Sequence, residues 1–384
     1  MERVHSELIR RLSGSFDFVV LSHTLQPDLS KLVTWRRVRT PRRPAAIALP
    51  LFFGVGSLYA ARLDVDILHT CGAIVGNRAQ LSTVHFCHAG FRIANEGLAP
   101  KGASIGRQLN TAFMRSFAIR AEQWCYRSER TEVLGAVSRR VEDELSEHYP
   151  FARVVSTPNG VDTERFHPDI SSRLETRRSR RVRPDEIVAL FVGGDWDRKG
   201  LALAIEGVAE ARRLGAPLRL WVLGSGPRDR FHRYAIDRGV VGEVDFLGQD
   251  DEPARWYQGA DIYLCCSKYE AFSLAMIEAA SSQLPVVTTA VGGAAEIVYG
   301  EGEAHRPGGV IVERDATELA RVLASLAIDH DRRRQLGATA RIRADSFGWD
   351  RLAETTAMLY SEILKDSGRR PEPNGFKSAG SGQA

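Results

Sequence analysis

Two glutamates stand eight positions apart in the segment SKYEAFSLAMIEAASSQLPVV of this 384-residue chain. We expect Glu270 in a strand-to-helix loop and Glu278 one to two turns into the helix. The backbone N–H groups of Phe272, Ser273 and Leu274 lie between them, where unsatisfied donors and a partial positive charge make an anion site. One carboxylate could accept hydrogen bonds from a ribose diol while the other faces a sugar ring. The alternative is that Glu270 is a first-turn acid and Glu278 a solvated helix residue.

A second segment with candidate chemistry is FVGGDWDRKGL, at residues 191–201. It predicts a buried strand, a turn at Gly193 and Gly194, and a helix that Arg198 and Lys199 enter. Glycines let the backbone approach a ligand closely, and an ammonium group is a mobile point charge suited to a diphosphate. Lys199 stands out because arginine supplies nearly every other cation, although a polar residue in a first helical turn is commonly just solvated.

Two further glycine pairs follow predicted strands. Gly292 and Gly293 come after PVVTTA and before Glu296, as in the sharp strand-to-helix turns that border phosphate sites. Gly224 and Gly226 lack the third glycine and the distal acid of a dinucleotide fingerprint, so an NAD site is not expected.

The elements that must position these residues alternate between short apolar runs and helical patterns, which is typical of an α/β fold. In the first half, strands are predicted at 16–22, 66–72, 82–89 and 131–138, and a helix follows with Ser138 as its N-cap. In the second half, strands are predicted at 187–194, 218–226, 244–249, 261–267, 285–290 and 308–312. We therefore expect two Rossmann-like doubly wound domains, with ligands at the carboxyl ends of the strands in a cleft between the domains.

Composition is that of a globular protein, with 52 Lys plus Arg against 48 Asp plus Glu, a net charge of +4 and a hydrophobic fraction of 43%. The length predicts two domains, at 1–162 and 163–346. A last helix at 347–366 and a Pro-, Gly- and Ser-rich tail at 367–384, expected to be disordered, complete the chain. The arginine-rich stretch 171–184 is interpreted as a solvated linker or edge between the halves.

Cysteine usage and the N-terminus indicate a cytoplasmic protein. The five cysteines are too few and too badly spaced for a zinc site, and their odd number argues against a disulfide framework. The start MERVHSELIRRL is charged and amphipathic, unlike a secretory signal. The arginine runs come without interleaved aromatics or a recognised binding motif, so no nucleic-acid partner is expected.

One uncharged stretch, Pro44 to Ala61, follows five arginines at 36–43. Three interpretations are open: a core helix of the α/β domain, a contact with a membrane interface, or a membrane span. Pro50, Gly54 and Gly56 interrupt the stretch and many of its residues are alanine, which favours the core helix.

Several motifs occur together in a recognisable order. They are PNGVDTERFHP at 158–168, FVGGDWDRKG, VDFLG, the Glu270/Glu278 pair, LPVVTTAVGGAAEIV and the closing SFGWDRLAE. In this order they resemble the retaining, GT-B fold glycosyltransferases known as glycosyl transferases group 1, or family 4. The resemblance covers most of residues 66–365 and is strongest in the second half.

The resemblance implies a nucleotide-sugar donor, most commonly a UDP-sugar in this family, held mainly by the C-terminal domain. By motif position, Lys199 would bind the diphosphate and Glu278 the ribose, and Glu270 with the amides of 272–274 would bind the sugar and phosphates. The family usually has an arginine where this chain has Gly194, so Arg198 would assist Lys199. The final helix would cross back to the first domain.

In the first domain, His85 in STVH matches the family's T-x-H position at the junction of sugar and acceptor, and His88 is a close second. Either histidine could instead be a hydrogen-bonded residue at a strand end. Cations and helix N–H groups at the leaving phosphate make a metal cofactor unnecessary. The D-x-D formed by Asp64 and Asp66 is interpreted as a structural pair flanking a strand.

The chain opens at Met1-Glu2-Arg3-Val4, inside what resembles the family's G-G-x-E-R helix. We therefore expect that the first strand and glycine-rich loop are missing, through a start codon assigned too far downstream or a truncation. The acceptor is open between a glycan, a lipid-linked saccharide and a small molecule, with the inner membrane face as one candidate location. The alternatives to a transferase are a non-catalytic nucleotide-sugar-binding protein and a nucleotide-sugar epimerase or phosphorylase on the same fold.

Overall fold

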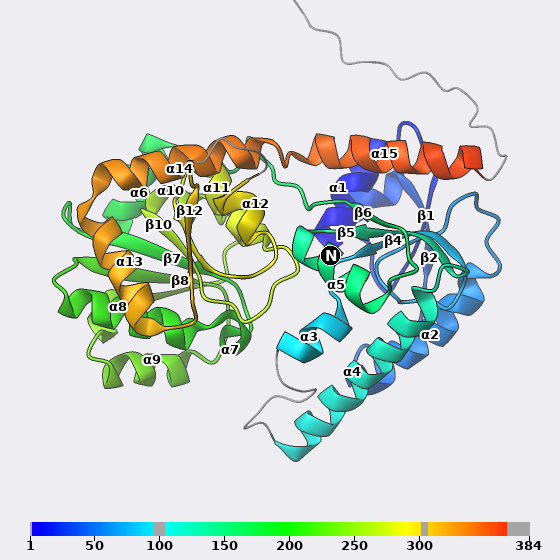
Figure 1. The fold of residues 1–384 in the computed structure, drawn as a ribbon, viewed down its shortest axis with the longest axis horizontal. Coiled ribbons are helices and arrows are strands. Elements are labelled where there is room, and N and C mark those ends of the chain that lie inside the picture. The colour runs from blue at the N-terminus through cyan, green and yellow to red at the C-terminus, as the bar shows by residue number, and fades with distance from the viewer. Residues whose placement is uncertain (1, 95–103, 301–305, 367–384) are drawn as a thin grey trace, which may run out of the picture. The chain divides into compact units, whose positions relative to one another are not determined.

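The computed structural model describes residues 2–94, 104–300 and 306–366, so the predicted tail at 367–384 lies outside the described residues. The chain divides into two compact units (Figure 1). Unit 1 takes its described residues from Met1–Val137, Glu142–Thr157 and Trp349–Ala384. Unit 2 takes its described residues from Ser138–Val141 and Pro158–Gly348. The helix α15 (Trp349–Asp366) is therefore part of unit 1, although it follows all of unit 2 in the sequence.

Unit 1 contains a parallel sheet of four strands in the order β3 (His69–Thr70), β4 (Ala79–Val84), β5 (Thr131–Ala136) and β6 (Val154–Ser156). Predicted strands at 66–72, 82–89 and 131–138 correspond to β3, β4 and β5. The strand β4 ends at Val84, so His85 and His88 both follow it at its carboxyl end.

The predicted strand at 16–22 forms a separate sheet. It is β1 (Phe18–Ser22), which pairs in parallel with β2 (Val33–Arg37) in the register Phe18 to Val33, and η1 (Pro27–Lys31) connects them. The sequence analysis did not predict β2. Its last four residues are exposed and two of them are arginines, so it lacks the apolar pattern that marks a buried strand.

The helices of unit 1 surround these two sheets. They are α1 (Glu2–Leu12), α2 (Ala45–Ala60), α3 (His88–Ala94), α4 (Ile105–Cys125), α5 (Arg139–His148), whose first three residues belong to unit 2, and α15. The predicted N-cap of α5 is confirmed, because Ser138 Oγ accepts a hydrogen bond of 3.2 Å from the Val141 N–H. The first and last helices pack together, with Arg11 Nε 2.6 Å from Asp350 Oδ1.

The uncharged stretch 44–61 is a helix, but its interpretation as a core element is wrong. In α2 only Gly56 and Ala60 are buried, whereas Ile47, Leu51 and Leu58 are 52%, 42% and 61% exposed. The stretch was ambiguous because an uncharged run has no polar face to show which side meets solvent. Among the described helices, none is long and apolar enough to cross a membrane.

Unit 2 contains one parallel sheet of six strands, as predicted. The order is β12 (Gly309–Val312), β11 (Val286–Thr289), β10 (Ile262–Cys265), β7 (Ile187–Val192), β8 (Leu218–Leu223) and β9 (Val244–Gly248). The chain moves outward from β7 to β9 and then returns to β10, so the direction of winding reverses there. Because crossovers between parallel strands are right-handed, this reversal puts the helices that connect β10 to β11 and β11 to β12 on the opposite face of the sheet. The helix that follows β12 returns to the first face.

Both faces of this sheet are buried. Ala189, Phe191 and Leu220 belong to the core shared with α8 (Leu201–Arg213), α9 (Arg228–Asp237) and α13 (Ala316–Ile328). On the other face, Trp221 contacts Trp256 and Tyr263 contacts Tyr257, both on α10 (Ala254–Gly259). The remaining elements of the unit are α6 (Ile170–Ser179), α7 (Trp196–Lys199), η2 (Val241–Glu243), α11 (Leu274–Ser281), α12 (Ala294–Val298) and α14 (His330–Asp345).

The arginine-rich stretch 171–184 is not the solvated linker that was expected, because much of it is the helix α6. Asp169 caps this helix by accepting a 2.9 Å hydrogen bond from the Ser172 N–H. Arg173 and Arg177 both bind the carboxylate of Asp261, at 2.5 and 2.7 Å. The arginines that made the stretch look solvated instead anchor α6 to the start of β10.

Candidate active site

The turn after β7 brings Lys199 against a glycine. Gly193 has φ +138°, and a Cβ there would lie 2.8 Å from Lys199 Cε. The Trp196 indole N–H donates to the Gly193 carbonyl at 2.9 Å, which fixes the turn from its other side. Gly193 is therefore required by its backbone conformation, and its missing Cβ leaves room for the Lys199 side chain. At Gly194, in contrast, a Cβ would make only an ordinary 3.5 Å contact with the Ser225 carbonyl.

Neighbouring glycines let the loops at the carboxyl ends of the strands pack closely. Gly200 ends α7 with φ +79°, and a Cβ there would lie 2.0 Å from the Cys266 carbonyl oxygen. Gly224 has φ +123°, and its Cβ would lie 2.4 Å from the Gly193 carbonyl oxygen. The Gly224 and Gly226 pair, which did not fit a dinucleotide site, thus has a structural reason: a Cβ at Gly226 would clash with Trp196.

Glu270 lies at the centre of a charged cluster. Its Oε1 atom is 2.8 Å from Lys199 Nζ and 3.0 Å from Arg198 Nη1, and it accepts a 2.9 Å hydrogen bond from Ser267 Oγ. Burial alone would raise the pKa of Glu270, but the charges of Lys199 and Arg198 hold that pKa below its ordinary value. The carboxylate is therefore ionised at neutral pH, and it holds two cations beside the first turn of α11.

The two cations have different surroundings. Arg198 also donates to the Tyr269 carbonyl at 2.8 Å and pairs with Asp195 at 3.1 Å, so it ties the turn after β7 to the loop after β10. Lys199 is a flexible point charge whose ammonium can turn toward an anion without breaking those backbone links. Of the two predicted diphosphate ligands, Lys199 is the freer one to meet a ligand, and Arg198 holds the loops together.

The start of α11 has the predicted form. Ser273 is its N-cap and accepts a 3.4 Å hydrogen bond from the Met276 N–H. Phe272 and Ser273 are 6% and 3% exposed. The N–H groups at the start of α11, beginning at Leu274, have no preceding helical carbonyl to accept a hydrogen bond from them. The backbone donors thus lie on the same loop as Glu270, as the sequence predicted.

The turn at Gly292 and Gly293 packs directly on this loop. A Cβ at Gly292 would lie 1.9 Å from the Ala271 carbonyl oxygen, and the Gly292 N–H donates to the Glu270 carbonyl at 2.9 Å. Gly293 has φ +87° and is the N-cap of α12. The predicted sharp strand-to-helix turn is present, and it supports the backbone of Glu270.

Glu278 is not a solvated helix residue. It is 8% exposed, and its Oε2 atom accepts a 2.8 Å hydrogen bond from the Tyr257 hydroxyl. A buried carboxylate held by a phenol is oriented for a specific contact rather than exposed for solubility. The sequence analysis missed Tyr257, which lies on α10 at a position that no motif spacing relates to Glu278.

In unit 1, His88 is paired with a buried glutamate. His88 Nδ1 lies 2.7 Å from Glu122 Oε1, and the His88 backbone N–H lies 2.9 and 3.1 Å from the two carboxylate oxygens. The Tyr149 hydroxyl donates to Glu122 Oε2 at 3.0 Å, and Glu122 is 2% exposed. Glu122 therefore engages Nδ1 of His88, and Nε2 is the ring nitrogen that Glu122 does not engage.

The sequence analysis missed Glu122 and Tyr149. A signal for Glu122 existed, because Ala118 and Cys125 precede and follow it at helical spacing and all three are buried on α4. A glutamate on the apolar face of a helix requires a buried partner, which here is His88.

His85 has a different environment, directly after β4. Of the described residues, none offers a hydrogen-bond partner to its buried Nε2 atom. Burial holds the pKa of His85 well below its ordinary value, so the ring is neutral at physiological pH. The alternative of a hydrogen-bonded residue at a strand end describes His88, which pairs with Glu122, whereas Nε2 of His85 has no such partner among the described residues.

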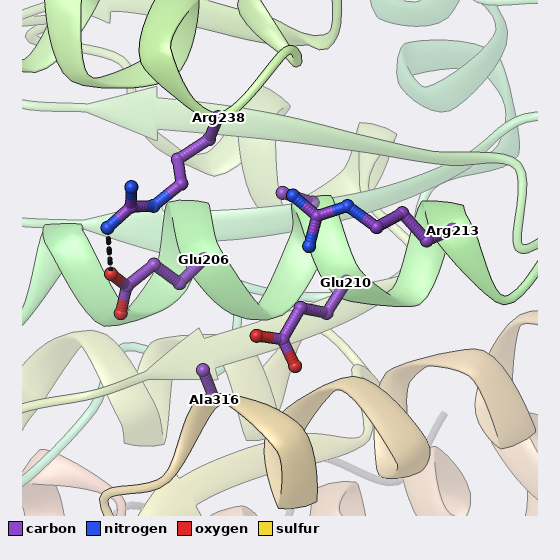
Figure 2. Close-up of a pocket in the computed structure, with 6 residues that line it drawn as sticks. Glu206, Glu210, Arg213, Arg238 and Ala316 are labelled. Carbon is purple, nitrogen blue, oxygen red and sulfur yellow. Dashed lines mark hydrogen bonds and ion pairs between the residues drawn. The ribbon is translucent and has the colours of Figure 1, made fainter.

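Two other features do not add to the site. Asp64 and Asp66 are exposed in the loop between α2 and β3. A hollow of about 320 Å³ in unit 2 is lined by six residues, among them Glu206, Glu210 and Arg213 (Figure 2). Arg238 closes one side of it with a 2.7 Å ion pair to Glu206, and none of the predicted site residues lines it.

Two family models match consecutive parts of the chain. The model described as "Glycosyltransferase Family 4" matches residues 1–165, and the one described as "Glycosyl transferases group 1" matches residues 172–343. The chain belongs to the group 1, family 4 glycosyltransferases. The resemblance inferred from the motifs is confirmed.

Two curated relatives of this chain are named D-inositol 3-phosphate glycosyltransferase. The one from Paenarthrobacter aurescens (strain TC1) is 33% identical over 231 residues, which is 58% of this chain and 55% of the relative. The one from Streptomyces bingchenggensis (strain BCW-1) is 30% identical over 311 residues, which is 77% of this chain and 64% of the relative. The chain thus spans between half and two thirds of the length of these relatives.

Solved structures confirm the fold class of the family member. WaaG, a glycosyltransferase involved in lipopolysaccharide biosynthesis, matches with a TM-score of 0.76 and 19% identity over 94% of this chain and 95% of that one. Anabaena HepE, solved in complex with UDP and glucose, matches with a TM-score of 0.67 and 16% identity over 94% of this chain and 96% of that one. These likenesses confirm the two Rossmann-like units of the expected GT-B class.

Proposed function

We propose that this protein transfers a sugar from a nucleoside-diphosphate sugar to an acceptor, with retention of anomeric configuration. The observation that carries the proposal is the cluster of Lys199, Arg198 and Glu270 beside the first turn of α11, with the buried Glu278 on the same helix. UDP is the proposed nucleotide. HepE, which shares the fold, was solved with UDP and glucose, and this supports the choice.

The chemistry follows from where negative charge develops. When the anomeric C–O bond breaks, positive charge builds on the sugar ring and negative charge on the departing diphosphate. Preorganised donors aimed at that diphosphate lower the barrier, and Lys199 together with the N–H groups of the first turn of α11 would supply them. In this proposal no metal cofactor takes part, and the acceptor attacks from the face that the diphosphate leaves.

Glu278 would bind the ribose of the donor. A carboxylate can accept hydrogen bonds from both hydroxyls of a diol. The 2.8 Å hydrogen bond from Tyr257 holds Glu278 Oε2, so the carboxylate has one orientation before the donor binds. Glu270 would face the sugar ring while it keeps Arg198 in place.

On the acceptor side, His88 and His85 are the proposed contacts with a hydroxyl group. The pairing of His88 with Glu122 keeps Nδ1 protonated, which makes Nε2 a hydrogen-bond acceptor for an attacking hydroxyl.

The acceptor itself is a glycan, a lipid-linked saccharide or a small molecule. A membrane-bound acceptor is supported by α2, where exposed Ile47, Leu51 and Leu58 follow the arginines at 36–43, a combination suited to the surface of anionic lipids. Such a protein would act from the cytoplasmic face of the membrane.

The test combines donor binding with product analysis. UDP, GDP, ADP and their common sugar conjugates are screened for a rise in melting temperature, since a ligand of the native state stabilises it by mass action. The expected result is a shift with UDP and UDP-sugars that is lost in Glu278→Ala and kept in Glu313→Ala, an exposed glutamate of the same unit.

Acceptors are then supplied with the sugar donor, and the products are identified by mass spectrometry and by NMR of the anomeric proton. A new α-linkage from an α-linked donor supports retaining transfer. Binding without turnover would favour the non-catalytic alternative, and a free sugar phosphate or an epimerised donor would favour a phosphorylase or an epimerase. No shift with any nucleotide, in a protein that melts cooperatively, would refute the donor site.

A further inference from the structure

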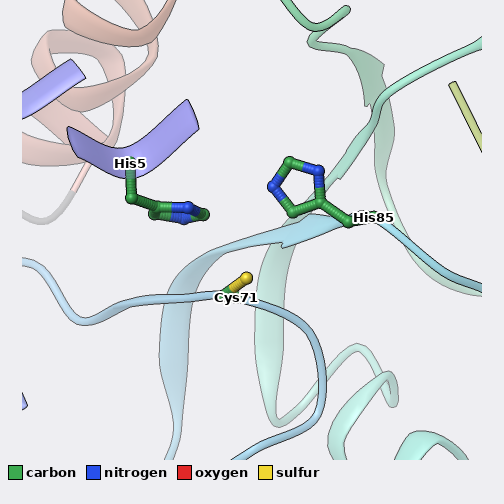
Figure 3. Close-up of side chains that lie close together, drawn as sticks. All are labelled: His5, Cys71 and His85. Atoms are coloured by element: carbon green, nitrogen blue, oxygen red, sulfur yellow. The ribbon is translucent and has the colours of Figure 1, made fainter. Parts of the chain in front are cut away.

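Three potential metal ligands meet in unit 1, whereas the proposed donor-binding residues belong to unit 2. His5 comes from α1, Cys71 follows β3 and His85 follows β4 (Figure 3). The strands β3 and β4 are parallel neighbours, so the residues that follow them lie at one edge of the sheet. One ligand atom from each of the three side chains lies within 4.8 Å of the other two.

The side chains of this cluster are set up to bind rather than to pack. His85 Nε2 is buried, and no described residue offers it a hydrogen bond. A buried polar nitrogen without a partner costs free energy, so its presence indicates a ligand at this point. The rings of His5 and His85 meet edge to face, with centroids 5.5 Å apart.

A third histidine, His69, lies beside the cluster and packs against His5. His69 Nδ1 is 2.6 Å from the Tyr360 hydroxyl and its Nε2 is 2.7 Å from Thr83 Oγ1, so both of its ring nitrogens are engaged. Its ring lies 5.5 Å from that of His5. His69 therefore holds His5 in place and leaves three ligands for an ion.

We propose that His5, Cys71 and His85 form a site for one zinc-type divalent transition-metal ion. Two imidazoles and a thiolate are the donors that zinc and its neighbours prefer, whereas magnesium and calcium require oxygen ligands. Around a tetrahedral zinc the ligand atoms stand roughly 3.3–3.8 Å apart, so the observed side chains need to move by only about 1 Å. Three protein ligands leave the fourth position of the ion for water or another small ligand.

The binding step balances without a redox change. The Cys71 thiol loses its proton to solvent as the sulfur–metal bond forms, and the neutral histidines each contribute a lone pair. Burial raises the pKa of the Cys71 thiol to about 11 in the metal-free protein, so the ion, rather than the surroundings, drives the loss of that proton. Metal binding at neutral pH therefore releases one proton per chain.

The expectation of no zinc site was based on cysteine spacing alone. Cysteine spacing does not show a site in which a single cysteine meets two histidines from other segments. The proposed site is independent of donor binding, because all three ligands belong to unit 1. His85 is also one of the two proposed acceptor contacts, so an ion bound here would leave that contact to His88. Failure of the metal site would leave the proposed donor site and sugar transfer intact.

The full chain, stripped with a chelator, is titrated with Co²⁺ and then with Zn²⁺. We expect one Co²⁺ per chain, visible bands of a tetrahedral ion and a near-ultraviolet thiolate-to-cobalt band, all removed by one equivalent of Zn²⁺. Cys71→Ser is expected to abolish the thiolate band. Cys125→Ser, which alters a buried cysteine of the same unit, is expected to keep it.

His5→Gln provides a second variant in case Cys71→Ser does not fold, and circular dichroism and the melting temperature establish the fold of each. Each ligand variant should weaken Co²⁺ binding by more than the roughly 100-fold that the loss of an outer-shell partner can cost. Binding below one ion per chain in the folded wild type would overturn the proposal. Binding that is unchanged in folded Cys71→Ser and His5→Gln would also overturn it.

Discussion

Lys199→Met removes the one cation of the donor cluster that is free to turn toward a diphosphate. In the free protein its Nζ lies 2.8 Å from Glu270 Oε1, and its side chain is 14% exposed. A hydrogen bond to a charged group contributes about 1.5–3 kcal/mol. Because the ammonium must be shared with Glu270, the lower half of that range applies, which corresponds to a loss of UDP affinity of about 10- to 40-fold.

The same substitution should change stability only modestly. Removing one partner of a buried ion pair costs about 3–5 kcal/mol when the remaining charge is left alone. Glu270 keeps Arg198 at 3.0 Å and Ser267 at 2.9 Å, so we expect a loss in the free energy of unfolding of about 1–2 kcal/mol. The protein should therefore remain folded at the temperature at which binding is measured.

Isothermal titration calorimetry with UDP measures the affinity, and urea unfolding measures the stability. The matched control is Lys268→Met, which removes an exposed lysine next to the same loop and should change neither quantity by a measurable amount. Two results would refute the reasoning: an unchanged dissociation constant in folded Lys199→Met, or an equal loss in Lys268→Met. The first result would mean that Lys199 does not bind the donor. The second would mean that Lys199 acts only through the net charge of the protein.

Three further outcomes are expected. Glu122→Gln should lower the free energy of unfolding by about 2–3 kcal/mol, because a buried carboxylate that accepts from three donors is neutralised, and urea unfolding measures this. The pKa of Glu270 is lowered in the folded protein, so its carboxylate stabilises the protein fully above the ordinary carboxyl pKa and loses that effect as pH falls through the folded value. In Glu270→Gln, the free energy of unfolding should therefore change less with pH between about pH 5 and 3. A melting series over that range would contradict this if the two curves stayed parallel. Gly200→Ala should cost at least about 2 kcal/mol through its φ of +79° and its contact with the Cys266 carbonyl, whereas Gly242→Ala, with open space around it, should change stability by less than about 0.5 kcal/mol.

Much of unit 2 could be predicted from the sequence. Its six strands are short apolar runs because a parallel sheet covered on both faces buries every position, and this pattern is visible along the chain. Ligand-facing loops follow the carboxyl ends of these strands, so the glycine turns and the Glu270 loop could be located without coordinates. The first domain was harder, since β2 is exposed and rich in arginine and α2 is uncharged all round, and neither has a pattern that shows which side is buried.

The sequence by itself determined the α/β class, the family and the segments that carry the donor chemistry, because these depend on local patterns and on motifs that are contiguous in the chain. Only the tertiary structure decided which charges meet. Lys199 reaches Glu270, Glu122 holds His88, and Cys71 joins two histidines, each across a long stretch of intervening chain. Packing of helices and strands sets such contacts, and the spacing of residues along the chain does not record them.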